Sequence, residues 1–226
     1  VLVDCDGQAN LTRFHLPEFD AENNPTVADI LMGTGETVWS DNLMPLAPDL
    51  QLLPGDAMLY DLDRRAIQDG VSAPERIRGF VEAAREDDDT DYMIFDCPPG
   101  YTIASVGALL AADDVIVPML VDGFSFAGMA DLSQQIASLR RVREGLKIAG
   151  VLVTQWHNSL VVQQGEKLLR QMSVPVFRQT IRRTDKVPES TFDRQPIVSY
   201  SPKSAASQDY RRWVMEYLRE ELGYGI

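Results

Sequence analysis

Three aspartates stand directly after apolar segments, at two places far apart in the chain. Asp4 and Asp6 follow Val1–Val3, and Asp96 follows Tyr92–Phe95. An apolar run without in/out alternation is typical of a strand buried on both faces of a parallel sheet. Carboxylates at the carboxyl ends of such strands lie at the rim where open α/β sheets bind ligands, and Mg²⁺ prefers oxygen ligands. Three carboxylates in one crevice would repel one another without a cation, so their convergence would be one argument for a metal there, and an acidic turn without a ligand is the alternative.

The residues after Asp96 bear on how this carboxylate is presented. Pro98 and Pro99 follow it closely. Pro98 lacks the N–H that a sheet needs, and Pro99 restricts Pro98 to an extended conformation, so the chain leaves the sheet here. Asp96 then faces the crevice, like the Asp of a Walker B strand, which holds the Mg²⁺ of a bound nucleotide. The alternative is an Asp that caps the next helix, and this short motif alone leaves both interpretations open.

The rest of the chain alternates strand patterns with helix patterns. Apolar runs predict further strands over residues 50–53, 115–118, 148–154 and 176–181. Amphipathic or apolar segments predict helices over residues 26–31, 58–68, 74–85, 101–111, 124–143, 160–172 and 204–222. The last helix is expected to bury one face, formed by Tyr210, Trp213, Val214, Tyr217 and Leu218. This alternation predicts one α/β domain over residues 1–226, with a doubly wound, mostly parallel sheet.

Composition is that of a globular chain with one substantial core. The chain has 226 residues, of which 45% are hydrophobic. No apolar run approaches the ~20 residues that a membrane-spanning helix needs. The two cysteines, Cys5 and Cys97, each follow an Asp at the end of an apolar run, which predicts buried thiols rather than a disulfide or a metal pair. Together these features favour a cytoplasmic protein.

The net charge of −13 is unevenly distributed along the chain. Residues 1–100 carry 21 acidic and 6 basic side chains, whereas residues 101–226 carry 13 and 15. The C-terminal half is therefore compatible with an anionic partner. Its candidate basic residues are Lys203, Arg211 and Arg212 at the last helix, and Arg140, Arg141 and Arg143 with Lys147. The alternatives are helix pairs with Asp209 and Glu216, and a solvated helix end.

Several segments occur in an order that resembles a known family. Asp4–Thr12 reads Asp-Cys-Asp-Gly-Gln-Ala-Asn-Leu-Thr, and residues 91–99 have the Walker B pattern described above. Further segments follow in the order Ala112–Pro118, Phe124–Ile136, Ile181–Arg183, Val187–Ser190, Gln195–Ile197 and Tyr200–Ser204. Over nearly the whole chain, this series resembles the ParA/MinD-type ATPases with a deviant P-loop, and the ParA branch in particular. The family has Pro at the position of Gly7.

The resemblance implies a P-loop NTPase-like fold of the SIMIBI type, with ATP and Mg²⁺ as cofactors. In such a site Asp6 orients the attacking water, and Asp4 and Asp96 hold Mg²⁺ through its water shell. The loop around Arg182 places its backbone against the adenine. The residues that the resemblance implies in cofactor binding are Asp4, Asp6, Asp96, Pro98, Arg182 and Arg183.

One departure from the family concerns the phosphate-binding loop, Gly-Gly-Val-Gly-Lys-Thr-Thr, which these 226 residues do not contain. The resemblance places it roughly 30 residues before Asp4, on the first strand and helix of a βαβ unit. That strand would lie beside the Walker B strand, and without it residues 91–95 would form an unpaired apolar edge, which natural sheets avoid. We therefore expect the first strand and helix to be missing by truncation, and the chain as given not to hydrolyse ATP. A naturally loop-less relative is the alternative.

The function that the resemblance implies is a partition or positioning ATPase. It would form an ATP-dependent homodimer, bind DNA without sequence preference through Lys203, Arg211 and Arg212, and be released when a ParB-like partner stimulates hydrolysis. Such a protein is cytoplasmic and associates with the nucleoid when ATP is bound. One alternative is a MinD-like membrane positioner, which needs a basic amphipathic C-terminal helix, whereas residues 219–226 are partly acidic and predict no stable membrane anchor. Another is a non-catalytic binding module that has lost the loop.

Overall fold

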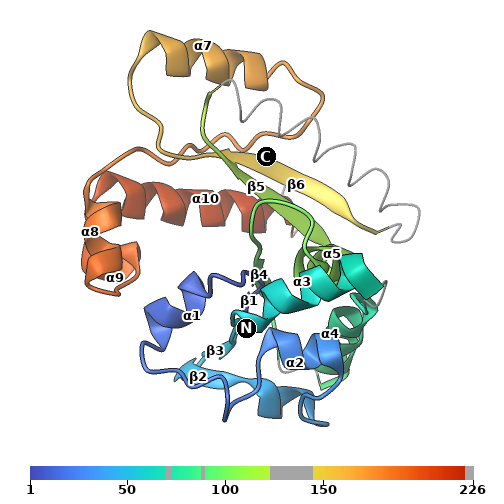
Figure 1. Ribbon diagram of the computed structural model, residues 1–226. Coiled ribbons are helices and arrows are strands. Elements are labelled where there is room, and N and C mark those ends of the chain that lie inside the picture. The colour runs from blue at the N-terminus through green and yellow to red at the C-terminus, as the bar shows by residue number, and fades with distance from the viewer. Residues whose placement is uncertain (70–72, 88–89, 123–144, 222–226) are drawn as a thin grey trace. The chain divides into compact units, whose positions relative to one another are not determined.

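The computed structural model describes residues 1–69, 73–87, 90–122 and 145–221 (Figure 1). The chain divides into two compact units, Val1–Ala112 and Asp113–Ile226, which are described separately below as unit 1 and unit 2. The single domain expected from the sequence stays a prediction. The predicted helix over residues 124–143, with Arg140, Arg141 and Arg143, lies outside the described residues.

Unit 1 contains a four-stranded sheet with the strand order β2-β3-β1-β4. Its strands are β1 (Leu2–Asp4), β2 (Met44–Ala47), β3 (Leu50–Leu53) and β4 (Ile94–Asp96). β1 pairs in parallel with both β3 and β4, and β2 adds to the edge in the antiparallel direction. The predicted α/β fold with a mostly parallel sheet is confirmed. Because β1, β3 and β4 run in one direction, their carboxyl ends lie on the same side of the sheet.

Short helices and apolar side chains complete unit 1. The helices are α1 (Asn10–His15), α2 (Val27–Met32), the 3₁₀ helix η1 (Trp39–Asn42), α3 (Met58–Asp69), α4 (Glu75–Asp87) and α5 (Ile103–Ala111). α2 begins with a capping box between Thr26 and Asp29 and ends at Gly33, whose φ of 75° suits glycine. The hydrophobic core joins β1, β3, α2, α3, α4 and α5 through side chains that include Val3, Leu53, Val27, Leu59, Phe80 and Ala108.

Unit 2 contains a parallel pair of strands, β5 (Asp114–Met119) and β6 (Lys147–Val153). Its described helices are α7 (Leu160–Leu169), α8 (Lys186–Phe192), α9 (Ile197–Tyr200) and α10 (Ala205–Glu221). α10 packs Tyr210, Trp213 and Tyr217 near Phe177, and the Phe177 and Trp213 rings meet edge to face with centroids 5.7 Å apart. Three of the five residues predicted for its buried face therefore do pack. Val214 does not, because its side chain is 42% exposed.

The predicted strand over residues 176–181 is wrong. The segment makes isolated bridges at Val176 and Arg182 instead. Between them, two backbone N–H groups donate to the carboxylate of Glu216 on α10, at 2.6 and 2.9 Å. Because Glu216 takes these donors, the segment does not continue the sheet beside β6 as a regular strand.

The strand that carries Asp96 differs from its prediction in length and burial. β4 spans Ile94–Asp96 only, and Ile94 is 59% exposed rather than buried on both faces. The cause is its position at the end of the strand order, where β1 is its partner within the sheet. This is the apolar edge that the sequence predicts for a sheet without a strand beside the Walker B segment.

Among the helices that the structure describes, none has both the length and the apolar character that crossing a membrane requires.

Candidate functional site

The parallel pairing of β1 and β4 brings two of the three predicted aspartates together. Asp4 and Asp96 are direct partners in the register, and each is the last residue of its strand. The pairing continues one residue further, because the backbone N–H of Cys5 donates to the carbonyl oxygen of Asp96 at 2.8 Å. Asp6 follows in the loop that leaves β1. The sequence prediction that these aspartates share one side of the sheet is consistent with this register.

Asp4 is fully buried and is held by hydrogen bonds on both carboxylate oxygens. Thr12 donates to Oδ2 from its backbone N–H at 2.8 Å and from its hydroxyl at 2.7 Å, and the N–H of Asp6 donates to Oδ1 at 3.3 Å. The Thr12 hydroxyl in turn accepts from the N–H of Gly55 at 2.9 Å. A Cβ at Gly55 would lie 2.4 Å from the carbonyl oxygen of Asp4, so glycine is required by space here. Asp4 therefore joins the loop after β1 to the loop after β3.

Asp6 is half-buried, and its carboxylate is less engaged than that of Asp4. Its Oδ1 accepts from the backbone N–H of Gln8 at 2.9 Å, and its carbonyl oxygen accepts from the N–H of Ala9 at 2.8 Å. Ala9 has a φ of 52°, which lets the chain turn sharply into α1. Within the described part of the chain, Oδ2 of Asp6 takes part in no hydrogen bond. This oxygen is free to bind a water or another polar group.

The charges at the strand ends disfavour ionisation of Asp96. Part of this residue is exposed, yet burial of its carboxylate, followed by the negative charges of Asp4 and Asp6, raises its pKa above the usual value. A cation would relieve this repulsion. Among the residues that the structure describes, no three His, Cys, Asp or Glu side chains are grouped so that they could hold a metal ion by themselves. The arrangement fits Mg²⁺ held by one or two carboxylates with waters and phosphates, which is its usual mode, rather than an all-protein cage.

A cavity of about 270 Å³ lies beside Asp6 and includes residues that sequence reasoning missed. Pro98, whose role in cofactor binding stays a prediction, lines it, and so do Tyr60 and Asp63 of α3. The Tyr60 ring fills the space that a side chain at Gly7 would need, because a Cβ there would lie 2.9 Å from two ring atoms. This contact explains how the chain accommodates Gly7 where the family pattern has Pro.

Asp63 connects α3 to the loop after β4. Its Oδ1 accepts from the backbone N–H of Ile103, the first residue of α5, at 2.7 Å. Burial raises the pKa of Asp63, and this hydrogen bond opposes that effect. Tyr60 and Asp63 are three residues apart, so the amphipathic pattern of α3 places them on one helix face. The sequence pattern does not indicate which loops this helix face contacts.

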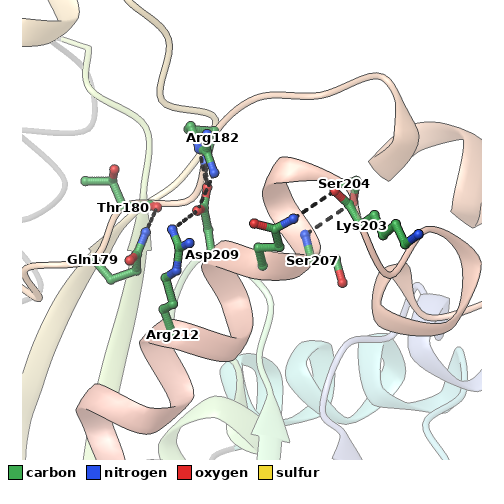
Figure 2. Close-up of polar contacts among 9 residues, drawn as sticks. Gln179, Thr180, Arg182, Lys203, Ser204, Ser207, Asp209 and Arg212 are labelled. Carbon is green, nitrogen blue, oxygen red and sulfur yellow. Dashed lines mark hydrogen bonds and ion pairs between the residues drawn. The ribbon is translucent and has the colours of Figure 1, made fainter.

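Arg182 is bound to a buried carboxylate in unit 2 (Figure 2). Its Nε and Nη2 each lie 2.8 Å from an oxygen of Asp209, and its backbone N–H donates to Oδ2 at 3.1 Å. Asp209 is 1% exposed. Burial acts to raise the pKa of Asp209, but the hydrogen bonds and the charge of Arg182 outweigh it, and the pKa is lowered. The guanidinium of Arg182 thus has a structural partner, while Arg183 is exposed and its N–H donates to the carbonyl oxygen of Trp156.

The three basic residues predicted to bind DNA lie at or near the start of α10 and are exposed. Arg212 pairs with Asp209 at 3.7 Å, so two arginines share one carboxylate (Figure 2). Arg211 donates to the carbonyl oxygen of Val198 at 3.3 Å, which leaves its charge uncompensated by that contact. Lys203 precedes the helix, and its carbonyl oxygen accepts from Gln208 at 3.0 Å. The alternative pairing with Glu216 does not arise, because Glu216 binds backbone N–H groups.

The predicted residues are divided between the two units. Asp4, Asp6, Asp96 and Pro98 belong to unit 1, where the structure brings them to one side of the sheet and its adjoining cavity. Arg182, Arg183, Lys203, Arg211 and Arg212 belong to unit 2. Their roles toward a nucleotide or DNA stay predictions.

Comparison with known proteins gives consistent matches. A family model described as an AAA domain matches residues 1–148. The chromosome partitioning protein ParA of Caulobacter vibrioides is 30% identical over 226 residues, which cover 98% of this chain and 83% of that protein. The chromosome-partitioning ATPase Soj of Thermus thermophilus is 32% identical over 237 residues, which cover 96% of this chain and 82% of that protein.

Solved structures share the fold. Cobyrinic acid a,c-diamide synthase from Mycobacterium smegmatis, with bound ADP and magnesium, superimposes with a TM-score of 0.76. The match covers 99% of this chain and 83% of that one, at 24% sequence identity. At this identity the likeness concerns the arrangement of strands and helices.

Proposed function

The chain belongs to the ParA/MinD-type family of P-loop ATPases, and we propose that it serves as a partition ATPase that binds ATP with Mg²⁺. We propose further that ATP binding drives formation of a homodimer, that the dimer binds DNA without sequence preference, and that a ParB-like partner stimulates hydrolysis. In this cycle the protein is cytoplasmic and associates with the nucleoid while ATP is bound. Relatives that partition chromosomes support the general function.

The observation that carries the nucleotide site is the meeting of acidic residues at the ends of β1 and β4. Asp4 and Asp96 are partners in the register, and the charges of Asp4 and Asp6 contribute to the raised pKa of Asp96. Carboxylates that repel one another at a sheet rim are unfavourable unless a cation binds there. This supports a Mg²⁺–nucleotide complex on unit 1.

The aspartates would take two roles in this proposal. Asp96 and Asp4 would hold Mg²⁺ indirectly, through its water shell, since the oxygens of Asp4 already accept hydrogen bonds. Asp6 has a free Oδ2 with which to orient the attacking water. Bound Mg²⁺ supplies charge neutralisation of the phosphoryl group, so the protein contributes positioning rather than covalent catalysis. Pro98 lines the cavity beside Asp6 on unit 1.

Hydrolysis also needs a phosphate-binding loop, which the 226 residues do not contain. We therefore propose catalysis for a protein in which such a loop precedes Asp4. The direct test compares the 226-residue chain with the protein that includes this loop. ATP binding and hydrolysis are expected in the longer protein alone, and equal ATP hydrolysis by both would contradict the proposed dependence on the loop.

Asp6 is tested by replacement in the protein that carries the loop. Asp6→Ala should retain ATP binding, measured with a fluorescent ATP analogue, while hydrolysis falls by roughly 10²-fold or more, the scale of water-orienting groups. Asp49→Ala is the matched control, because Asp49 is an exposed aspartate of the same unit in the turn between β2 and β3. Unchanged hydrolysis in Asp6→Ala would remove Asp6 from the mechanism.

A further inference from the structure

The two cysteines of the chain follow the two aspartates that pair in the register. Asp4 is opposite Asp96, and the hydrogen bond from the N–H of Cys5 to the carbonyl oxygen of Asp96 extends this pairing toward Cys97. Neighbouring strands lie about 4.8 Å apart, which is inside the Cα separation of about 4.4–6.8 Å that a disulfide requires. The backbone therefore places Cys5 and Cys97 within bridging distance.

The two side chains also interact. Each thiol influences the other, because interaction with Cys97 raises the pKa of Cys5 and interaction with Cys5 lowers the pKa of Cys97. Cys5 is buried and Cys97 is exposed, which corrects the sequence prediction that both are buried thiols. The chain has two cysteines, so neither has another intramolecular partner.

We propose that Cys5 and Cys97 form a reversible disulfide when the protein meets a hydroperoxide, with Cys97 as the reacting thiol and Cys5 as the resolving thiol. The pairing of the two strand ends beyond Asp4 and Asp96, and the unequal exposure of the two cysteines, carry this assignment. An accessible cysteine beside a second cysteine is the usual arrangement of peroxide-sensitive pairs.

The two steps balance with hydrogen peroxide as the oxidant. The Cys97 sulfur attacks one peroxide oxygen, the O–O bond breaks, and Cys97 becomes a sulfenic acid as water leaves. The Cys5 sulfur then attacks the Cys97 sulfur, the S–O bond breaks, and a second water leaves as the disulfide forms. Two thiols are oxidised, one peroxide is reduced, and a dithiol reductant reverses the change.

The bond would fix the loop that carries Asp6 to the loop that carries Pro98. Any effect on nucleotide binding rests on the proposed function, whereas formation of the bond does not. Detection of the disulfide therefore tests this proposal independently of whether the protein is an ATPase.

The test exposes the reduced 226-residue chain to hydrogen peroxide, blocks free thiols with N-ethylmaleimide, and analyses monomeric protein by mass spectrometry without reductant. We expect loss of both alkylation sites, an intact mass lower by two hydrogen atoms, and a peptide pair linking Cys5 to Cys97 that dithiothreitol separates. In Cys5→Ser, dimedone should trap a sulfenic acid at Cys97. In Cys97→Ser, Cys5 should stay unoxidised.

Three results would overturn the assignment. One is a wild-type chain that keeps both thiols under conditions that oxidise free cysteine. The second is Cys97 oxidised to sulfinic acid while Cys5 remains alkylatable. The third is a disulfide that appears between two chains only. All three are read from the unmodified protein, so they hold even if a serine variant fails to fold.

Discussion

Thr12 determines how firmly Asp4 is held, and its hydroxyl serves two partners at once. It donates to the buried Asp4 carboxylate and accepts from the N–H of Gly55. Thr12→Val keeps the shape of the side chain and removes both bonds. Oδ2 of Asp4 keeps the backbone N–H of Thr12, so the N–H of Gly55 is the group left without a partner. Because a buried polar group without a partner costs about 1–3 kcal/mol, we expect the free energy of unfolding to fall by about 1–3 kcal/mol in a urea titration.

Thr12→Ser is the matched control for this loss. Serine retains the hydroxyl and gives up one methyl group, so its effect should stay within about 1.5 kcal/mol. Equal destabilisation by Val and Ser would mean that packing, and not the hydrogen bonds to Asp4 and Gly55, stabilises this junction.

Asp96 is expected to cost stability in the metal-free protein. Its folded-state pKa is raised, so the folded chain binds the proton more tightly than the unfolded chain, whose Asp pKa is about 3.9. The penalty is absent below the unfolded pKa and grows as pH rises through the folded pKa. Asp96→Asn should therefore raise the melting temperature at pH 7 and have little effect near pH 3.

The size of this gain should be below about 1 kcal/mol, because Asp96 is exposed and solvent screens its charge. Thermal unfolding at the two pH values, without divalent metal, measures the difference. Asp49→Asn, in the exposed turn after β2, is the control for a general charge effect. A lower melting temperature for Asp96→Asn at pH 7 would show that Asp96 stabilises the fold.

Helix α3 links the loops that follow β1 and β4, because Tyr60 packs on Gly7 and Asp63 caps α5 at Ile103. Asp63→Ala should destabilise the first turn of α5 by about 0.5–2 kcal/mol, the usual cost of a lost cap. Hydrogen exchange of the Ile103 amide should accelerate accordingly. Asp63→Asn retains an accepting oxygen and should lose less. Equal exchange rates of the Ile103 amide in wild type and Asp63→Ala would show that Asp63 does not stabilise the first turn of α5.

At the scale of elements, the sequence predicts most of what depends on periodicity. Helices α2, α3, α4, α5, α7 and α10 begin and end within three residues of their predicted limits at 26–31, 58–68, 74–85, 101–111, 160–172 and 204–222, whereas the short helices α1, η1, α8 and α9 were not predicted. β2 was not predicted, since its four residues include Pro45 and have no strand pattern. The strand expected over residues 176–181 is wrong because a distant side chain, Glu216, binds its backbone.

In the candidate site, too, some features could be predicted from local sequence and others could not. The meeting of Asp4 and Asp96 follows from two parallel strands that each end in an acid, which is a local signal. The positions of Tyr60 and Asp63 against two loops depend on how α3 packs, and no local pattern encodes that packing. The ion pair between Arg182 and Asp209 joins residues 27 positions apart, so it could not be predicted from local sequence either.

For the molecule as a whole, the net charge of −13 opposes DNA binding unless the basic residues act together. Lys203, Arg211 and Arg212 are exposed, although Arg212 shares Asp209 with Arg182. For the ATP-bound protein with its phosphate loop, we expect log affinity for random duplex DNA to fall linearly with log salt concentration, by a slope of about −0.9 per phosphate neutralised. Arg211→Glu with Arg212→Glu should flatten this slope and leave DNA-free ATPase activity unchanged.

Arg64→Glu with Arg65→Glu is the charge-matched control, because both arginines are exposed on α3 of unit 1. Fluorescence anisotropy over a range of salt concentrations measures the slopes. If the α10 variant and the wild type had the same slope, DNA contacts would be assigned to other basic residues, with Arg140, Arg141 and Arg143 as the next candidates.

The two edges of the β2-β3-β1-β4 sheet are unlike in what they offer to another polypeptide. β2 presents Pro45, which has no N–H to donate, and an irregular register between Pro45 and Ala47. β4 has no proline within Ile94–Asp96 and exposes Ile94. A strand from another polypeptide can therefore pair with the β4 edge of this sheet, whereas the β2 edge is blocked. In concentrated solutions of the 226-residue chain, self-association should begin at β4, and a charged substitution at Ile94 should suppress it.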